Sequence, residues 1–244
     1  MLSKVICREA LPKPTWDRER TEEELAQHKR ELLDESEGVL DVWQRGFFSP
    51  RQLAFKSALD SKMARLDAPH VKPLNNYIRQ LKMINQGTQY PFFDPDDGGV
   101  NARILFLFEK PGPMTDPTRP GRSGSGFISR DNDDPTAENT FRFMEEIKLP
   151  RNETVTWNII PGWNGTRKIT SKELLDGVSS LKELLSFFQV LTDIVLVGRK
   201  AQLAMNFLPS KYRVISSSHP SNLVRARYPE KWRAIPLEWS KVNI

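Results

Sequence analysis

From Arg103 onward, short runs rich in β-formers alternate with segments of helical pattern, and this alternation restricts the possible fold more than any other feature. The strand-like runs are RILFLFE, VTWNIIP, DIVLVG and RVISSS, and the helical segments fall near residues 136–147, 171–191 and 201–208. Such alternation predicts a parallel sheet covered by helices on both faces, because parallel strands need crossover connections. We therefore expect a three-layer α/β/α fold with a central, mostly parallel four-stranded sheet.

The residues before this region have a different pattern. Thr21 and Glu24 have capping-box spacing at the start of a charged helical segment, and Ser49 before Pro50 is a good helix entry. A third helical segment has Leu74, Tyr77, Ile78 and Leu81 on one apolar stripe and stops at Gly87. We expect residues 1–90 to form an N-terminal helical arm packed on the core, and residues 91–244 to form the α/β domain.

Composition excludes several classes of protein. The 244 residues are 38% apolar, which suffices for a core, and no run approaches the length of a membrane span. One cysteine and three scattered histidines do not make a Cys-rich zinc or iron–sulfur site. We expect no metal, no cofactor and no membrane partner, and we expect a monomer. Because the N-terminus lacks the apolar stretch of a signal peptide, we expect the protein in the cytoplasm (bacterial cytosol or nucleoid).

The ends of the four expected strands carry polar, Gly-rich or Pro-rich stretches: FEKPGP, WNIIPGWNG, GRKA and SSSHPSN. Ligands of open α/β sheets bind beyond the carboxyl ends of the strands. The chain is also basic after Leu191, although such an imbalance is more often a solvated face than a nucleic-acid site. We therefore expect the functional site at these strand ends.

Taken in order, the strand ends resemble the motifs of the uracil-DNA glycosylase superfamily over about residues 103–232. FEKPG is similar to that family's first motif in its Gly-Glu-Ala-Pro-Gly version, and GRSGSGF falls where the family keeps a Gly-rich loop with a base-stacking aromatic. TWNIIP is similar to the strand whose Asn reads the base, VLVGRKA to the strand and helix before the last motif, and HPSNL to the His-Pro-Ser-Pro-Leu loop.

Two features depart from that pattern. The best-known branch has a water-orienting Asp at the third position of the first motif, where this chain has Lys110, and Phe108 replaces the first Gly. The branch with Glu and Ala usually carries four cysteines for an iron–sulfur cluster, and this chain has one. The resemblance is to the superfamily, as an atypical member, and not to one standard branch.

The resemblance implies that three residues bind a base that has been flipped out of the DNA. Phe127 would stack on the base, although plain core packing is the alternative. Asn158 would donate to a carbonyl and accept from an imide N–H, which matches the edge of uracil; a buried Asn closing a strand is the alternative. Neutral His219 would donate a hydrogen bond to the departing uracil, rather than being an ordinary loop histidine.

The turn FEKPG offers further candidates. Glu109 would position water or offset a sugar cation, with a structural carboxylate as the alternative, and Asp116 is a second water-positioning candidate or a turn-forming Asp. Pro111 and Gly112 would form part of the substrate site. Lys110 would repel a cation at the sugar, so we expect it to face a phosphate or solvent.

The DNA-binding residues implied by the same resemblance lie in the last loop. Leu223 would be the wedge that enters the duplex, Arg225 and Arg227 would bind phosphates, and Ser221 and Asn222 would belong to the same surface. The sequence thus predicts a DNA N-glycosylase that releases uracil from DNA in base excision repair. Two alternatives stay open: a catalytically weak protein that binds damaged or single-stranded DNA, and a nucleotide-handling enzyme built around GRSGSG, which lacks the Lys and Ser/Thr of a P-loop.

Overall fold

The computed structural model describes residues 49–243, and the charged helical segment expected near residues 21–43 lies outside this range. The described elements follow one another as η1 (Gln52–Ala54), α3 (Lys56–Met63), α4 (Lys72–Ile84), β1 (Phe92–Phe93), η2 (Gly99–Asn101), β2 (Ile104–Phe108), η3 (Pro113–Thr115), β3 (Phe127–Ile128), α5 (Pro135–Glu146), η4 (Arg151–Glu153), β4 (Thr154–Asn158), α6 (Ser171–Leu185), β5 (Asp193–Val197), η5 (Ala201–Phe207), β6 (Arg213–Ser217), α7 (Asn222–Arg227) and α8 (Pro229–Trp239).

The central sheet has four strands in the order β4-β2-β5-β6, and every pair is parallel. β2 and β5 are fully buried and consist of apolar runs such as ILFLF, as expected for strands covered on both faces. The prediction of a central parallel sheet of four strands is confirmed. A second, two-stranded parallel sheet pairs β1 with β3, which the sequence did not predict.

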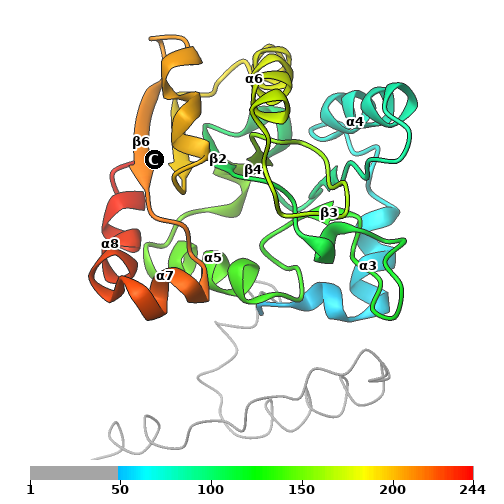
Figure 1. The fold of residues 1–244 in the computed structure, drawn as a ribbon, viewed down its shortest axis with the longest axis horizontal. Helices are drawn as coiled ribbons and strands as arrows, with labels where there is room; N and C mark the ends of the chain where they lie inside the picture. The colour runs from blue at the N-terminus through cyan, green and yellow to red at the C-terminus, as the bar shows by residue number, and fades with distance from the viewer. Residues whose placement is uncertain (1–48, 244) are drawn as a thin grey trace, which may run out of the picture.

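Helices cover both faces of the central sheet, so the fold has three layers (Figure 1). On one face α4 and α6 pack on the side chains of alternate strand positions, among them Leu105 and Leu107 of β2. On the other face α5 and α8 pack on Ile104 and Phe106 of the same strand, with Trp239 as the largest contact. The period of two along β2 thus divides one strand between two hydrophobic cores.

The described part of the expected N-terminal arm is helical, but it begins differently from the prediction. Within residues 49–243 the first α-helix starts at Lys56 rather than after Ser49, because Arg51 adopts a left-handed conformation (φ 65°) and a short 3₁₀ turn follows it. α4 ends before Gly87, whose φ of 88° suits glycine. No helix within residues 49–243 has the length and apolar character of a membrane span.

Candidate active site

A cavity of about 1000 Å³ opens at the carboxyl ends of the central strands. Its walls come from the turn after β2, the strand β4, the loop after β5, the loop after β6 and the N-terminal end of α5. Sequence-predicted residues that line it are Glu109, Lys110, Pro111, Gly112, Asn158, His219, Ser221, Asn222 and Leu223. The structure therefore brings nine of the predicted site residues to one cavity, as parallel topology requires.

His219 is half-buried in the loop between β6 and α7 and lines this cavity. Its ring meets the edge of Phe108 at a centroid distance of 5.8 Å. Burial lowers the pKa of His219, and Arg167 lowers it further, whereas the carboxylate of Glu109 opposes the shift. The imidazole is therefore neutral at pH 7 and has one N–H to donate.

Glu109 follows β2 directly, and its Oε1 accepts a hydrogen bond from the backbone N–H of Lys200 at 3.1 Å. Gly198 separates this carboxylate from the histidine. A methyl group on Gly198 would lie 2.7 Å from Glu109 Oε1 and 3.2 Å from His219 Cδ2, and the residue has a φ of 91°. Glycine at 198 thus allows the carboxylate and the imidazole to approach one another.

Asn158 closes β4 at the floor of the cavity and is 6% exposed. Its backbone pairs in register with Phe108, which places the amide beside the turn that carries Glu109. No hydrogen bond joins the Asn158 side chain to any residue within 49–243. A buried amide that lines a cavity without a protein partner has a donor and an acceptor left for a ligand.

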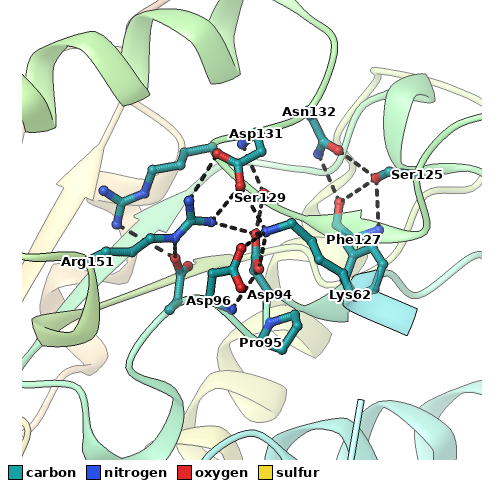
Figure 2. A network of polar contacts seen from close by, with 12 residues as sticks. Lys62, Asp94, Pro95, Asp96, Ser125, Phe127, Ser129, Asp131, Asn132 and Arg151 are labelled. Atoms are coloured by element: carbon teal, nitrogen blue, oxygen red, sulfur yellow. Dashed lines mark hydrogen bonds and ion pairs between the residues drawn. The ribbon is translucent and has the colours of Figure 1, made fainter. Parts of the chain in front are cut away.

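Phe127 is the clearest correction to the sequence prediction. The structure places it in β3, fully buried (0% exposed) against Phe92, and not among the residues that line the cavity. Its backbone N–H donates to Ser125 Oγ and its carbonyl accepts from Asn132 Nδ2 (Figure 2). Because successive side chains of a strand point to opposite sides, Ile128 faces the cavity instead. Core packing, the alternative interpretation of Phe127, describes this arrangement.

Lys110 also differs from the prediction that it faces a phosphate or solvent. Its side chain is 4% exposed, and its Nζ donates to Asn164 Oδ1 (2.9 Å), the Lys168 carbonyl (3.0 Å) and Glu173 Oε1 (2.6 Å). Three acceptors therefore hold the ammonium against the loop between β4 and α6. Lys110 is a structural link between two walls of the cavity and not a free cation in it.

Asp116 does not line the cavity. Its Oδ1 accepts hydrogen bonds from the backbone N–H (2.9 Å) and the hydroxyl (2.6 Å) of Thr118, which is the pattern of a turn-forming Asp. The hypothesis that Asp116 positions water is therefore corrected in favour of the turn. Glu109 is the carboxylate that the structure places beside His219.

Of the predicted DNA-binding residues, Ser221, Asn222 and Leu223 line the cavity, whereas Arg225 and Arg227 lie further along α7 and do not line it. Leu223 is 59% exposed at the start of α7, whose N-terminus is capped by the Ser221 hydroxyl. Asn222 contacts Asn139 of α5. Arg225 lies 5.8 Å from the Trp232 ring; it and Arg227 are both exposed, and neither forms an ion pair with another described residue.

Thr156, Arg130 and Arg167 are among the cavity residues that were not predicted from the sequence. Thr156 lies on β4 two positions before Asn158, Arg130 follows β3, and Arg167 lies in the loop after β4. The period of two along a strand already places Thr156 on the same side as Asn158, so this residue had a readable signal. Arg130 and Arg167 had none, since long-range packing brings their loops to the cavity.

A second polar region lies next to the cavity, around the ammonium of Lys62 on α3 (Figure 2). Lys62 is 2% exposed, and its Nζ contacts Asp94 (2.7 Å), Asp131 (2.8 Å) and Asp96. Arg151 adds ion pairs to Asp94 at 2.7 Å and Asp131 at 2.9 Å. Carboxylate oxygens of the three aspartates lie within 4.8 Å of one another, the spacing of a cation site, and the Lys62 ammonium is the cation that contacts all three. We call these five residues the ionic cluster.

The ionic cluster continues into the cavity wall. Ser129, which lines the cavity, donates to Asp94, and Arg130, its neighbour in the wall, pairs with Asp97 at 3.7 Å. Burial raises the pKa of Asp97 to about 6 against the opposing effect of Arg151 and Arg130. The segment DPDDGG, residues 94–99, thus supplies three carboxylates to one polar network.

The fold is thus an α/β fold with a parallel sheet, and a neutral imidazole, a carboxylate and an amide without a protein partner line one cavity at the carboxyl ends of its strands. The family model described as the uracil DNA glycosylase superfamily matches residues 95–238. The chain belongs to this superfamily of DNA glycosylases, as its motifs suggested.

The similarity to a solved structure is weaker than the match to the family model. A crystal structure of a mimivirus UNG variant in complex with UGI has 15% sequence identity and a TM-score of 0.38, over 69% of this chain and 70% of that chain. No curated protein matches the sequence.

Proposed function

We propose that this protein is a uracil-DNA glycosylase that flips deoxyuridine out of DNA and hydrolyses its N-glycosidic bond, leaving the abasic site that base excision repair processes. The observation that carries the proposal is the meeting of the unpaired Asn158 amide and the neutral His219 in one cavity of the superfamily fold. The first group would read the base, and the second would stabilise it as it leaves.

Base selection would rest on Asn158. Its Nδ2 donates to the O4 carbonyl of uracil while its Oδ1 accepts from the N3–H, so both polar atoms of the amide are used. Cytosine presents an amino group and an unprotonated nitrogen at those positions, which leaves two donors facing one another and two acceptors facing one another. A buried site discriminates strongly against such a mismatch.

The chemistry would use His219 and Glu109. Water adds to C1′ of the sugar, the bond from C1′ to N1 breaks, and its electron pair leaves with uracil, which then takes up a proton. Negative charge collects on O2 of the departing base, where the neutral imidazole donates a hydrogen bond. Glu109, held by the Lys200 N–H, faces the cationic sugar and accepts a proton from the water.

DNA binding would use the rim. Leu223, exposed at the start of α7, would fill the gap left by the flipped base, and the exposed Arg225 and Arg227 would bind phosphates on either side. Apolar wedges beside basic residues are common in proteins that open a duplex. The protein would act on DNA as a cytoplasmic monomer.

One assay tests the proposal. The protein is incubated with an oligonucleotide containing a single uracil, in EDTA, and abasic sites are revealed by alkaline cleavage; a cytosine oligonucleotide is the control. We expect cleavage at uracil alone. Binding of the uracil oligonucleotide without any abasic product, at stoichiometric protein and long incubation, would overturn the proposal in favour of a DNA-binding protein on this fold.

A further inference from the structure

Thr156 is a buried residue of the cavity floor whose hydroxyl is not used by the protein. It is 7% exposed, it lines the cavity, and its Oγ1 has no hydrogen-bond partner among residues 49–243. Buried hydroxyls without a partner are rare in folded proteins because each has lost its water and gained nothing in return.

Two other buried threonine hydroxyls, those of Thr154 and Thr140, are hydrogen-bonded within the protein. Thr154, two positions earlier on the same strand, donates to the Arg151 carbonyl at 2.9 Å and accepts from Arg130 Nη2. Thr140 of α5, which also lines the cavity, donates to the Thr136 carbonyl at 2.8 Å. Thr156 differs from both in having a polar atom that faces no protein acceptor.

The position of Thr156 relates it to the base-reading amide. Thr156 and Asn158 occupy alternate positions of β4, so their side chains leave the strand on the same side. Two residues along a parallel strand are separated by about 6.6 Å, a distance that one ring with its hydrogen bonds can span. The unpaired hydroxyl and the unpaired amide thus lie on the same face of β4, and both residues line the cavity.

A second unused group indicates which kind of atom belongs there. Arg130 lines the same cavity, and its Nε is buried without a partner among the described residues. A guanidinium N–H only donates, and its positive charge favours an oxygen over an amino group. An oxygen acceptor would therefore suit both unused groups.

We propose that Thr156 is a specificity-determining residue, whose hydroxyl donates a hydrogen bond to the same carbonyl oxygen of the extruded base that the Asn158 amide contacts, O4 in the case of uracil. A carbonyl oxygen has two lone pairs and accepts both bonds. The inference rests on the proposed function, because it assumes that a flipped base enters the cavity. In this arrangement the Asn158 amide and the Thr156 hydroxyl both donate to the carbonyl oxygen, so base recognition depends on two side chains.

The test compares Thr156→Val, which keeps the shape and removes the hydroxyl, with Thr156→Ser, which keeps the hydroxyl. Thr140→Val is the matched control, since that hydroxyl is already bonded within α5. We expect Thr156→Val to lower kcat/KM on uracil DNA by roughly three- to tenfold, and the Ser variant and the control to remain within about twofold of the wild type. Thermal unfolding should show that Thr156→Val keeps or raises the Tm, because an unpaired hydroxyl has been replaced by a methyl group.

Substitution of the substrate identifies the atom. Replacing O4 of the target uracil by sulfur, a weak acceptor, should slow the wild type more than it slows Thr156→Val, whereas replacing O2 by sulfur should affect both proteins alike. A Thr156→Val variant that is fully active, or whose Tm is clearly lowered, overturns the inference about Thr156. The proposed function still stands in that case if the wild type excises uracil. A wild type without uracil excision overturns both.

Discussion

The cavity and the ionic cluster are two polar regions within residues 49–243 that share a wall at Ser129 and Arg130 and differ in how their polar atoms are paired. In the ionic cluster every carboxylate contacts at least one cation, and Lys62 alone contacts three. In the cavity, Asn158 and Thr156 have no side-chain partner among the described residues. Pairing offsets the cost of burying a charge, so removal of one partner is destabilising, whereas a buried group that is already unpaired costs stability and is retained where a ligand uses it.

This difference predicts that substitutions in the two regions fail in different ways. A variant of the ionic cluster should lose stability first and activity only as a consequence. A variant of the cavity should lose activity and keep its stability.

The largest effect is expected for Lys62→Met. The change leaves Asp94 and Asp131 buried without their ammonium, and removing one partner of a buried ion pair costs about 3 to 5 kcal/mol. Urea unfolding followed by circular dichroism measures the loss, and Lys56→Met, on an exposed position of the same helix, is the control. A loss below about 1 kcal/mol would show that the cluster does not stabilise the fold.

In the cavity, His219→Ala should lower single-turnover excision by about 10²-fold, the value of one donor to a developing anion. Its free energy of unfolding should stay within about 1 kcal/mol of the wild type, because no side-chain hydrogen bond of the protein is removed. An unchanged rate would remove His219 from the mechanism.

The pH dependence of the wild type should report the same residue. Burial holds the pKa of His219 below its ordinary 6.5, and only the neutral ring donates without repelling the sugar cation. Excision should therefore stay level as pH falls from 8 to 6.5 and decline at lower pH, as the ring takes up its proton. A decline that already begins above pH 7 would contradict a lowered pKa.

Glu109→Gln and Asp116→Asn form a matched pair of carboxylate-to-amide changes. Glu109 lines the cavity beside His219, so its loss should slow excision about tenfold or more. Asp116 forms a turn that Asn also forms, so its variant should remain within about twofold. Rates on one uracil oligonucleotide decide the ranking, and the reverse order would move the water site to Asp116.

The sequence predicted the central fold well because the information for it is local. The run DIVLVG predicted a strand at residues 193–198, and β5 spans Asp193–Val197. The short strands β1 and β3 were missed because two residues carry no recognisable period. Local runs of apolar residues therefore define the sheet, and long-range packing adds the rest.

Some residues of the candidate site could likewise be predicted from local sequence, and others depend on long-range contacts. Asn158 and His219 were predicted because TWNIIP and HPSNL, at the ends of two strands, resemble motifs of the superfamily, and topology brings both residues to one cavity. Lys110 was misjudged because its acceptors lie 54 to 63 residues further along the chain. Phe127 was misjudged because its pairing with Phe92, which decides the side it faces, is not visible in its own motif.

At the rim, Leu223→Ala should slow excision mainly from duplex DNA. The side chain is 59% exposed in the protein alone, so its removal should leave the fold intact. Insertion into a base stack would bury apolar surface worth about 1 kcal/mol, or roughly fivefold in rate. Single-stranded DNA has no stack to hold open and should be spared; equal losses on both substrates would reject the wedge.

The smallest effect per residue is expected for Arg225→Ala and Arg227→Ala, and it is of a different kind. Both side chains are exposed and have no ion pair among the described residues, so neither contributes much to stability and both are free to meet phosphates. Each variant should weaken binding to any DNA sequence and reduce the slope of log affinity against log salt by about 1 for each phosphate that the protein no longer neutralises. Fluorescence anisotropy at several salt concentrations measures the slope, and Arg142→Ala, whose guanidinium pairs with Glu138 on the outer face of α5, is the control. If the Arg225 and Arg227 variants keep the wild-type slope, their charge belongs to a solvated face, and Arg167 and Arg199, which line the cavity, become the next candidates for phosphate contacts.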